Sequence, residues 1–282
     1  MTIQEFRNLF YYGSNIFYGS AIFVYLFIII NSIIFINILK SICSGVYKNI
    51  FICSITFILM DFAAGGRMAV FYIFFFLLCG ILIKGKIKTK YRKNGFIIAV
   101  ITIVFLLVAF ITLTASRILE NEKSFFEFLY QYLVGPSFLY DYEINKGYVN
   151  SLISRKLSAA VASVDWLVVG ILKLFGFRLE TILVEWNSAL ATGRYLNRDY
   201  GINAHYTGYL FFELAFGTIF VVLLPIFFWM MIQFYSRLSP ELTLYFCFMI
   251  FILNRENLMN SPTFILVFLY FNYEIYKGRL KW

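Results

Sequence analysis

Charged residues, histidine and paired cysteines are all scarce in this chain, and each shortage removes a class of protein. Only 14% of the 282 residues are charged, and His205 is the single histidine. Soluble domains carry about a quarter charged residues, so a soluble core is excluded. One histidine excludes a multi-histidine metal centre. The four cysteines form no CxxC pair, which argues against a disulfide framework or a zinc site.

Long apolar runs take the place of the missing charge. Hydrophobic residues make up 61% of the chain and cluster in runs rather than in alternating or helical stripes. Such runs predict an all-α fold, a polytopic transmembrane helix bundle of about seven spans. The second, sixth and seventh are short for a bilayer, which needs about 20 apolar residues. The predicted spans are Ile16–Leu39, Ile50–Ala64, Met68–Ile83, Phe96–Thr114, Tyr206–Tyr235 with a kink at Pro225, Leu242–Leu253 and Pro262–Tyr276.

The basic residues predict one orientation for these spans. Six of them, between Lys84 and Lys93, crowd the link between the third and fourth spans, and the positive-inside rule makes that link cytoplasmic. Alternation then puts Lys40, Lys48 and the tail lysines inside, and Arg67, Arg255 and the N-terminus outside. The net charge of +9 is therefore interpreted as topogenic, and no nucleic-acid partner is expected.

One long external loop divides the chain into three predicted parts. Residues 1–114 and 206–282 carry the N-terminal and C-terminal spans, and residues 115–205 form the loop. Within the loop, Val164–Phe175 is apolar but too short to span. We interpret it as a short interfacial or re-entrant helix. If it crossed the membrane, the later loops would change sides and the tail lysines would face out.

Polar residues gather at the predicted outer surface. Arg67 follows Gly65-Gly66 at a span end, and Arg255 lies at another. Arginine binds phosphate through two parallel hydrogen bonds, so these residues are candidates for holding a pyrophosphate. The alternative is that both arginines extend to the interface as most span-end arginines do. Asp61, inside the second span, is interpreted either as part of this site or as a structural partner of Arg67.

The long loop supplies further candidates. His205, at its end, has the near-neutral pKa range of a general base for a sugar hydroxyl, or it is an interfacial histidine with a structural hydrogen bond. Tyr140 and Tyr142 are candidates for stacking on sugar rings. They fit the aromatic belt of a membrane interface equally well. Tyr132 and Tyr148 share both interpretations.

Three stretches resemble a known family. They are Ala63-Ala64-Gly65-Gly66-Arg67, Tyr132-Leu133-Val134-Gly135-Pro136-Ser137-Phe138, and Asn203-Ala204-His205-Tyr206-Thr207-Gly208-Tyr209-Leu210 continuing to Glu213-Leu214-Ala215-Phe216-Gly217. Together with the loop-and-span plan over roughly residues 50 to 276, they resemble O-antigen polymerases of the Wzy type, the bacterial oligosaccharide repeat-unit polymerases. The last stretch is also similar to the loop-to-helix entry of O-antigen ligases.

The resemblance implies a metal-independent glycosyltransferase in the bacterial inner membrane. Such enzymes polymerise undecaprenyl-pyrophosphate-linked glycan at the periplasmic face, without cofactors and with a chain-length co-polymerase as a partner. By its motif Arg67 would bind pyrophosphate and His205 would be the base, whereas Arg255 and Arg194 are candidates by topology alone. Family members carry more spans and a cytoplasmic N-terminus, so we expect either missing N-terminal helices, with loss of activity, or a compact member.

Three other functions remain open from the sequence. An O-antigen ligase would transfer the glycan to lipid A core, and a flippase would transport the lipid-linked unit. A transporter places ionisable residues at the midplane of discontinuous helices, whereas here they lie at the outer ends of spans. A purely structural membrane subunit is the third alternative.

Overall fold

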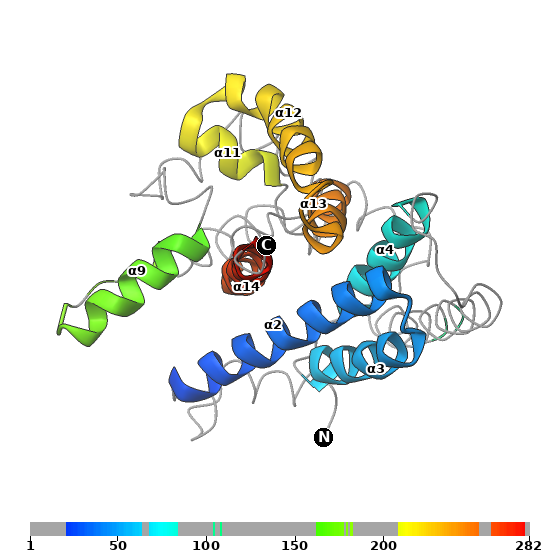
Figure 1. The fold of residues 1–282 in the computed structure, drawn as a ribbon. Helices are drawn as coiled ribbons and strands as arrows, with labels where there is room; N and C mark the ends of the chain where they lie inside the picture. The colour runs from blue at the N-terminus through cyan, green and yellow to red at the C-terminus, as the bar shows by residue number, and fades with distance from the viewer. Residues whose placement is uncertain are drawn as a thin grey trace, which may run out of the picture. The chain divides into compact units, whose positions relative to one another are not determined.

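The structure is a computed structural model that describes residues 21–63, 68–83, 104, 108, 162–177, 179, 181–182, 208–253 and 261–279. Within these residues all regular structure is α-helical and no strand occurs (Figure 1). The predicted all-α class is therefore confirmed for the described part of the chain. The helices are α2 (Ala21–Ser44), α3 (Tyr47–Ala63), α4 (Met68–Ile83), α9 (Ala162–Leu174), α11 (Gly208–Phe216), α12 (Thr218–Tyr235), α13 (Pro240–Ile252) and α14 (Pro262–Arg279).

Two of the described helices are long and apolar enough to cross a membrane. They are the Leu26–Ser44 part of α2 and the whole of α12. At about 1.5 Å per residue, α4 and α13 rise about 24 and 20 Å, less than the roughly 30 Å of a bilayer core. The observed α4 has the predicted bounds. The predicted span Phe96–Thr114 lies outside the described residues except for Val104 and Val108, which are helical.

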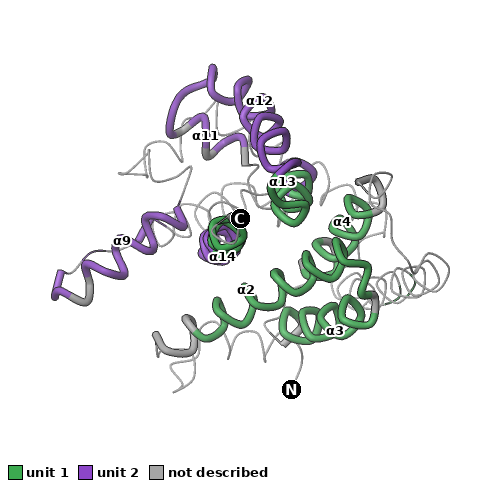
Figure 2. The backbone as a smooth tube through the Cα atoms, in the orientation of Figure 1, with its two compact units in different colours: residues 1–121, 238–248, 270–282 green, residues 122–237, 249–269 purple. Residues whose placement is uncertain are grey.

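The chain forms two compact units that alternate along the sequence (Figure 2). Unit 1 comprises residues 1–121, 238–248 and 270–282, and unit 2 comprises residues 122–237 and 249–269. Helix α13 belongs to unit 1 up to Phe248, and α14 belongs to it from Tyr270. Each unit therefore draws on segments that are distant in sequence.

A tight turn joins α2 to α3 in unit 1. Gly45 has a φ of 75°, a left-handed conformation that favours glycine. The Val46 N–H donates to the Ser41 carbonyl at 3.0 Å, which is the hydrogen bond of a Schellman ending. The turn folds α3 back against α2, so that Phe35 and Phe57 meet with their ring centroids 5.1 Å apart.

Aromatic rings from four helices form the core of unit 1. Phe76 of α4 stacks on Phe248 of α13 with centroids 3.8 Å apart, and both side chains are fully buried. The ring of Tyr245 also stacks with that of Phe76, and Phe35 meets Phe76 edge to face. Each such pair contributes about 0.5–1.5 kcal/mol beyond the burial of its area. Close packing continues at Gly80, where an added Cβ would lie 2.5 Å from the Cγ2 of Ile42.

In unit 2 the predicted fifth span is not one helix. The prediction of one helix over Tyr206–Tyr235 is wrong, because the chain breaks at Gly217 into α11 and α12, and the kink at Pro225 stays a prediction. Gly217 has φ 85° and ψ 171°, a conformation open essentially to glycine alone. Its N–H still donates to the Glu213 carbonyl at 2.8 Å, and the Thr218 hydroxyl donates to the Glu213 carboxylate at 3.0 Å. Pro225 lies inside the continuous helix α12.

Helix α9 begins a hairpin in unit 2. It ends in a second Schellman turn, with Gly176 at φ 86° and the Phe177 N–H donating to the Leu172 carbonyl at 3.2 Å. The chain then returns to the start of the helix, where the Asp165 carboxylate accepts the Ile182 N–H at 2.7 Å. The predicted segment Val164–Phe175 is therefore a short helix with a returning arm.

Candidate functional site

Polar groups of α2, α3 and α4 lie at a similar distance from the Gly45 turn. The Asp61 carboxylate of α3 accepts the Ala69 N–H of α4 at 2.8 Å, a charge-assisted hydrogen bond to the first turn of a helix. Asn31 precedes the end of α2 by 13 residues and Asp61 follows the start of α3 by 14, so both lie about 20 Å along their helices from the Gly45 turn. We call Asn31, Asp61 and the Ala69 N–H the outer polar level.

The outer polar level includes a side-chain oxygen that lacks a partner. Asn31 Oδ1 is buried and has no hydrogen-bond partner among the described residues. A buried acceptor without a donor costs about 1–3 kcal/mol. This oxygen is therefore suited to accept from a guanidinium or a hydroxyl group brought to this level of unit 1.

The hydrogen bond from Ala69 to Asp61 also closes the connection between α3 and α4. That connection consists of residues 64–67, which contain Gly65, Gly66 and Arg67. Asp61 therefore has the start of α4 as one of its partners, whereas its predicted pairing with Arg67 lies outside the described residues.

The residues predicted from the sequence lie outside the described part of the chain. This holds for the pyrophosphate candidates, for the base candidate and for both sugar-stacking candidates: Arg67, Arg255, Arg194, His205, Tyr140 and Tyr142. Their roles stay predictions. In sequence, Arg67 directly precedes the start of α4, and His205 precedes the start of α11 by three residues.

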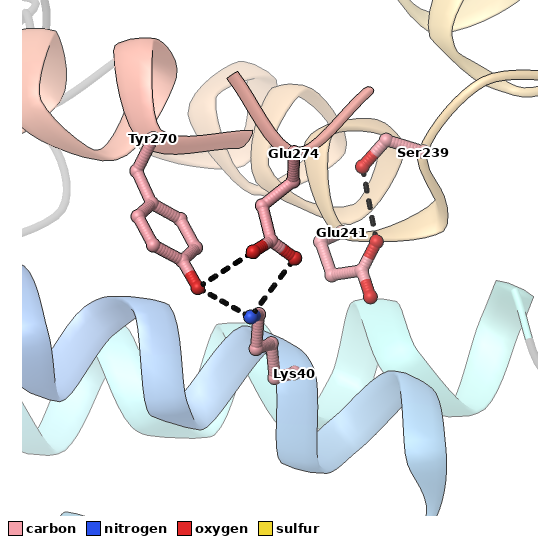
Figure 3. A network of polar contacts seen from close by, with 5 residues as sticks. All are labelled: Lys40, Ser239, Glu241, Tyr270 and Glu274. Atoms are coloured by element: carbon pink, nitrogen blue, oxygen red, sulfur yellow. Dashed lines mark hydrogen bonds and ion pairs between the residues drawn. The ribbon is translucent and has the colours of Figure 1, made fainter. Parts of the chain in front are cut away.

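A second polar cluster links α2 to α14 in unit 1 (Figure 3). Lys40 Nζ donates to Tyr270 Oη at 2.5 Å and to Glu274 Oε2 at 3.2 Å. Tyr270 Oη in turn donates to Glu274 Oε1 at 3.2 Å. The three side chains form a closed triangle in which every contact joins a donor to an acceptor. Sequence reasoning missed this cluster because it treated Lys40 only as a topogenic charge; an acidic residue inside the seventh apolar run, Glu274, was the signal available.

The neighbouring start of α13 is capped within the chain. Ser239 Oγ accepts the Leu242 N–H at 3.2 Å and donates to Glu241 Oε2 at 3.0 Å (Figure 3). Pro240 occupies the first helical position, where its missing N–H costs nothing. Ser239 is buried, so the cap gives its hydroxyl the hydrogen-bond partners that water does not supply there.

The described part of the chain contains no set of side chains that could bind a metal ion. No group of three or more histidine, cysteine, aspartate or glutamate side chains comes together there. Comparisons with family models, with curated proteins and with solved structures found no match to this chain.

Proposed function

We propose that this chain is a multi-pass inner-membrane glycosyltransferase that polymerises undecaprenyl-pyrophosphate-linked oligosaccharide repeat units at the periplasmic face, for O-antigen, capsule or exopolysaccharide synthesis. A hydroxyl of one repeat unit attacks the anomeric carbon of the growing chain. A new glycosidic bond forms, the bond from that carbon to the pyrophosphate oxygen breaks, and the lipid pyrophosphate leaves. His205 accepts the hydroxyl proton, and Arg67 with Arg255 and Arg194 stabilises the departing charge.

The bond between Asp61 and Ala69 is the observation that carries the proposal. Electrostatic stabilisation of a leaving group is effective only when the cation is held in place before the reaction. Arg67 lies in a four-residue connection whose two flanking helices are joined by that bond. Asn31 Oδ1 offers an acceptor at the same level as Asp61. We assign Asp61 as a positioning residue, since its carboxylate is engaged by the start of α4.

Contacts in unit 1 agree with the alternating directions predicted for its helices, which reversing inside and outside would leave unchanged. The orientation puts Lys40, Ile42, Gly80 and Glu274 toward the cytoplasm and Asp61 with Ala69 toward the outside. Lys40 bonds Glu274, Ile42 packs at Gly80, and Asp61 bonds Ala69. Each of these contacts pairs residues that are predicted to share a side.

Complementation tests the function. In a strain that lacks this chain, re-expressed wild type is expected to restore a ladder of long glycans on lipopolysaccharide. Arg67→Ala is expected to leave a single-repeat band at equal protein level. Arg237→Ala is the matched control, because Arg237 is exposed between α12 and α13 on the predicted cytoplasmic side. A normal ladder from Arg67→Ala removes that residue from the mechanism.

The strain that lacks the chain separates polymerisation from its alternatives. Loss of a polymerase leaves single repeats on lipid A core. Loss of a ligase leaves long glycans on undecaprenyl pyrophosphate and none on lipid A core. Loss of a flippase leaves single lipid-linked repeats on the cytoplasmic side. Either of the last two patterns overturns the proposed reaction.

Two substitutions of Asp61 are expected to shorten the glycan ladder to different extents in the same assay. Asp61→Asn keeps an oxygen that accepts the Ala69 N–H and should retain part of the ladder. Asp61→Ala removes the acceptor of a charge-assisted bond worth about 1.5–3 kcal/mol and should lose the ladder. Equal ladders from both variants would exclude a positioning role for the carboxylate.

A further inference from the structure

The polarity of helix α9 is reversed from that of a helix exposed to water. Among its described residues, the polar side chains of Ser163 and Asp165 are covered, at 0% and 9% exposure. Four of its apolar side chains are exposed, among them Val168 at 48% and Ile171 at 47%, whereas Val169 is buried. A helix on the surface of a soluble protein buries its apolar stripe and exposes its polar side. The reversed arrangement is stable only where the surroundings are apolar.

Exposed apolar side chains occur both on the helix and in the turn beyond it. Val164, Leu167, Val168 and Ile171 recur at spacings of three and four residues and therefore share one face of α9. Past the end of the helix, the exposed side chains are Phe175, Phe177 and Leu179. We call this set, from Val164 to Leu179, the α9 apolar surface.

The hairpin begins and ends at the same place. Asp165 lies in the first turn of α9, and its carboxylate bonds the backbone of Ile182, 17 residues later. The helix rises about 20 Å over its 13 residues, which is short of the roughly 30 Å of a bilayer core. A segment that is too short to cross, and whose two ends are bonded together, leaves on the side from which it came.

We propose that the α9 hairpin, residues 162–182, is a re-entrant membrane anchor whose apolar surface inserts into the outer leaflet of the bilayer. This goes beyond the proposed glycan chemistry and does not depend on it. The occupant is lipid hydrocarbon because the chain carries a helix able to span a membrane on each side of the hairpin, α2 before it and α12 after it.

The anchor sets the number of membrane crossings as well as holding the loop. A re-entrant hairpin adds no crossing, so the spans on its two sides keep the orientation predicted from the basic residues. The alternative of a spanning α9 would reverse every later loop. The hairpin also brings its flanking loop residues to the membrane surface, where a lipid-linked substrate is held.

Accessibility of spin labels tests the anchor in the full chain reconstituted in lipid vesicles. Single cysteines are placed at Leu167 and Phe177 in a chain whose four native cysteines are replaced by serine. Val222→Cys, on the exposed apolar side of α12, is the lipid reference, and Ser236→Cys, exposed at its end, is the water reference. Distinct values at the two references show that the background chain folds and inserts.

Lipid insertion gives a defined result. Labels at Leu167 and Phe177 should collide with oxygen as the Val222 label does, and should collide with a charged nickel chelate about tenfold less than the Ser236 label, because the chelate is expelled from hydrocarbon. Chelate access equal to that at Ser236 places the surface in water and overturns the proposal. Low access to both reagents shows protein covering the surface and overturns it as well.

A second measurement covers the case in which the cysteine-free chain fails to insert. A photo-crosslinking phenylalanine analogue replaces Phe177 in the chain with its native cysteines. Adducts with vesicle phospholipid support the anchor, whereas crosslinked dimers or the absence of lipid adducts contradict it. Neither measurement uses glycan, so a failure of the proposed polymerase function leaves both results unchanged.

Discussion

Exchanging the charges of Lys40 and Glu274 tests whether these side chains hold the C-terminal parts of α2 and α14 together. At the observed 3.2 Å and an effective dielectric of about 20, their Coulomb attraction has an upper bound of about 5 kcal/mol. The side chains are 37% and 45% exposed, so screening and desolvation leave a net coupling of about 1 kcal/mol.

The expected pattern is a loss that the double exchange repairs. Lys40→Glu or Glu274→Lys alone puts like charges side by side and should lower the free energy of unfolding by about 2 kcal/mol. The double exchange should lower it by less than about 1 kcal/mol, since the attraction returns with reversed sign. Equilibrium unfolding of the full chain in lipid micelles measures all three variants.

A third charge change serves as the control for the coupling of Lys40 and Glu274. Lys48→Glu, at an exposed position in the first turn of α3, should change the free energy of unfolding by no more than about 0.5 kcal/mol. A double exchange that costs as much as the two single exchanges together would show that Lys40 and Glu274 are not coupled. Tyr270→Phe, which removes the bridging hydroxyl, should cost about 1 kcal/mol.

Three further predictions concern packing, backbone and topology. Gly80→Ala should lower the free energy of unfolding by about 1–3 kcal/mol because the new Cβ meets Ile42 Cγ2. Adding Ile42→Leu, which lacks that methyl group, should restore part of the lost stability. Gly278→Ala, with open space around the new Cβ, should cost nothing. Gly217→Ala should cost about 1–3 kcal/mol through its backbone conformation alone, as measured by thermal unfolding, because no atom lies within 4 Å of the added Cβ. Reporter fusions at Lys88 and Asn150 should report opposite sides of the membrane, and a shared side would overturn the orientation.

The helices that were predictable are those in which local pattern decides the structure. The bounds of α4 follow from an apolar run between Arg67 and Lys84, and α9 follows from an apolar segment that is too short to span. The break at Gly217 was missed because the sequence there is as apolar as its surroundings. A proline in a sequence always restricts the backbone. A sequence does not show which glycine adopts a conformation that breaks a helix, as Gly217 does.

Contacts between distant segments were beyond sequence reasoning. Lys40 and Glu274 lie in separate apolar runs, and neither pattern specifies which helix meets which. Asp61 was recognised as unusual inside a span, but its bond to Ala69 depends on how α3 and α4 pack. The direct chemical candidates, including Arg67 and His205, lie outside the described residues, so their placement in a site rests on the sequence alone.

The alternation of the two units along the chain has a consequence for the order of synthesis. Glu274 is 234 residues from Lys40, so at about 5–20 residues per second it leaves the ribosome roughly 12–50 s later. During that interval α2, α3 and α4 have left the ribosome without the α13 rings that stack on Phe76 and without the carboxylate that pairs with Lys40. A nascent chain that stops before residue 238 lacks both contacts, so we expect α2, α3 and α4 to be less stable until α13 and α14 have been synthesised.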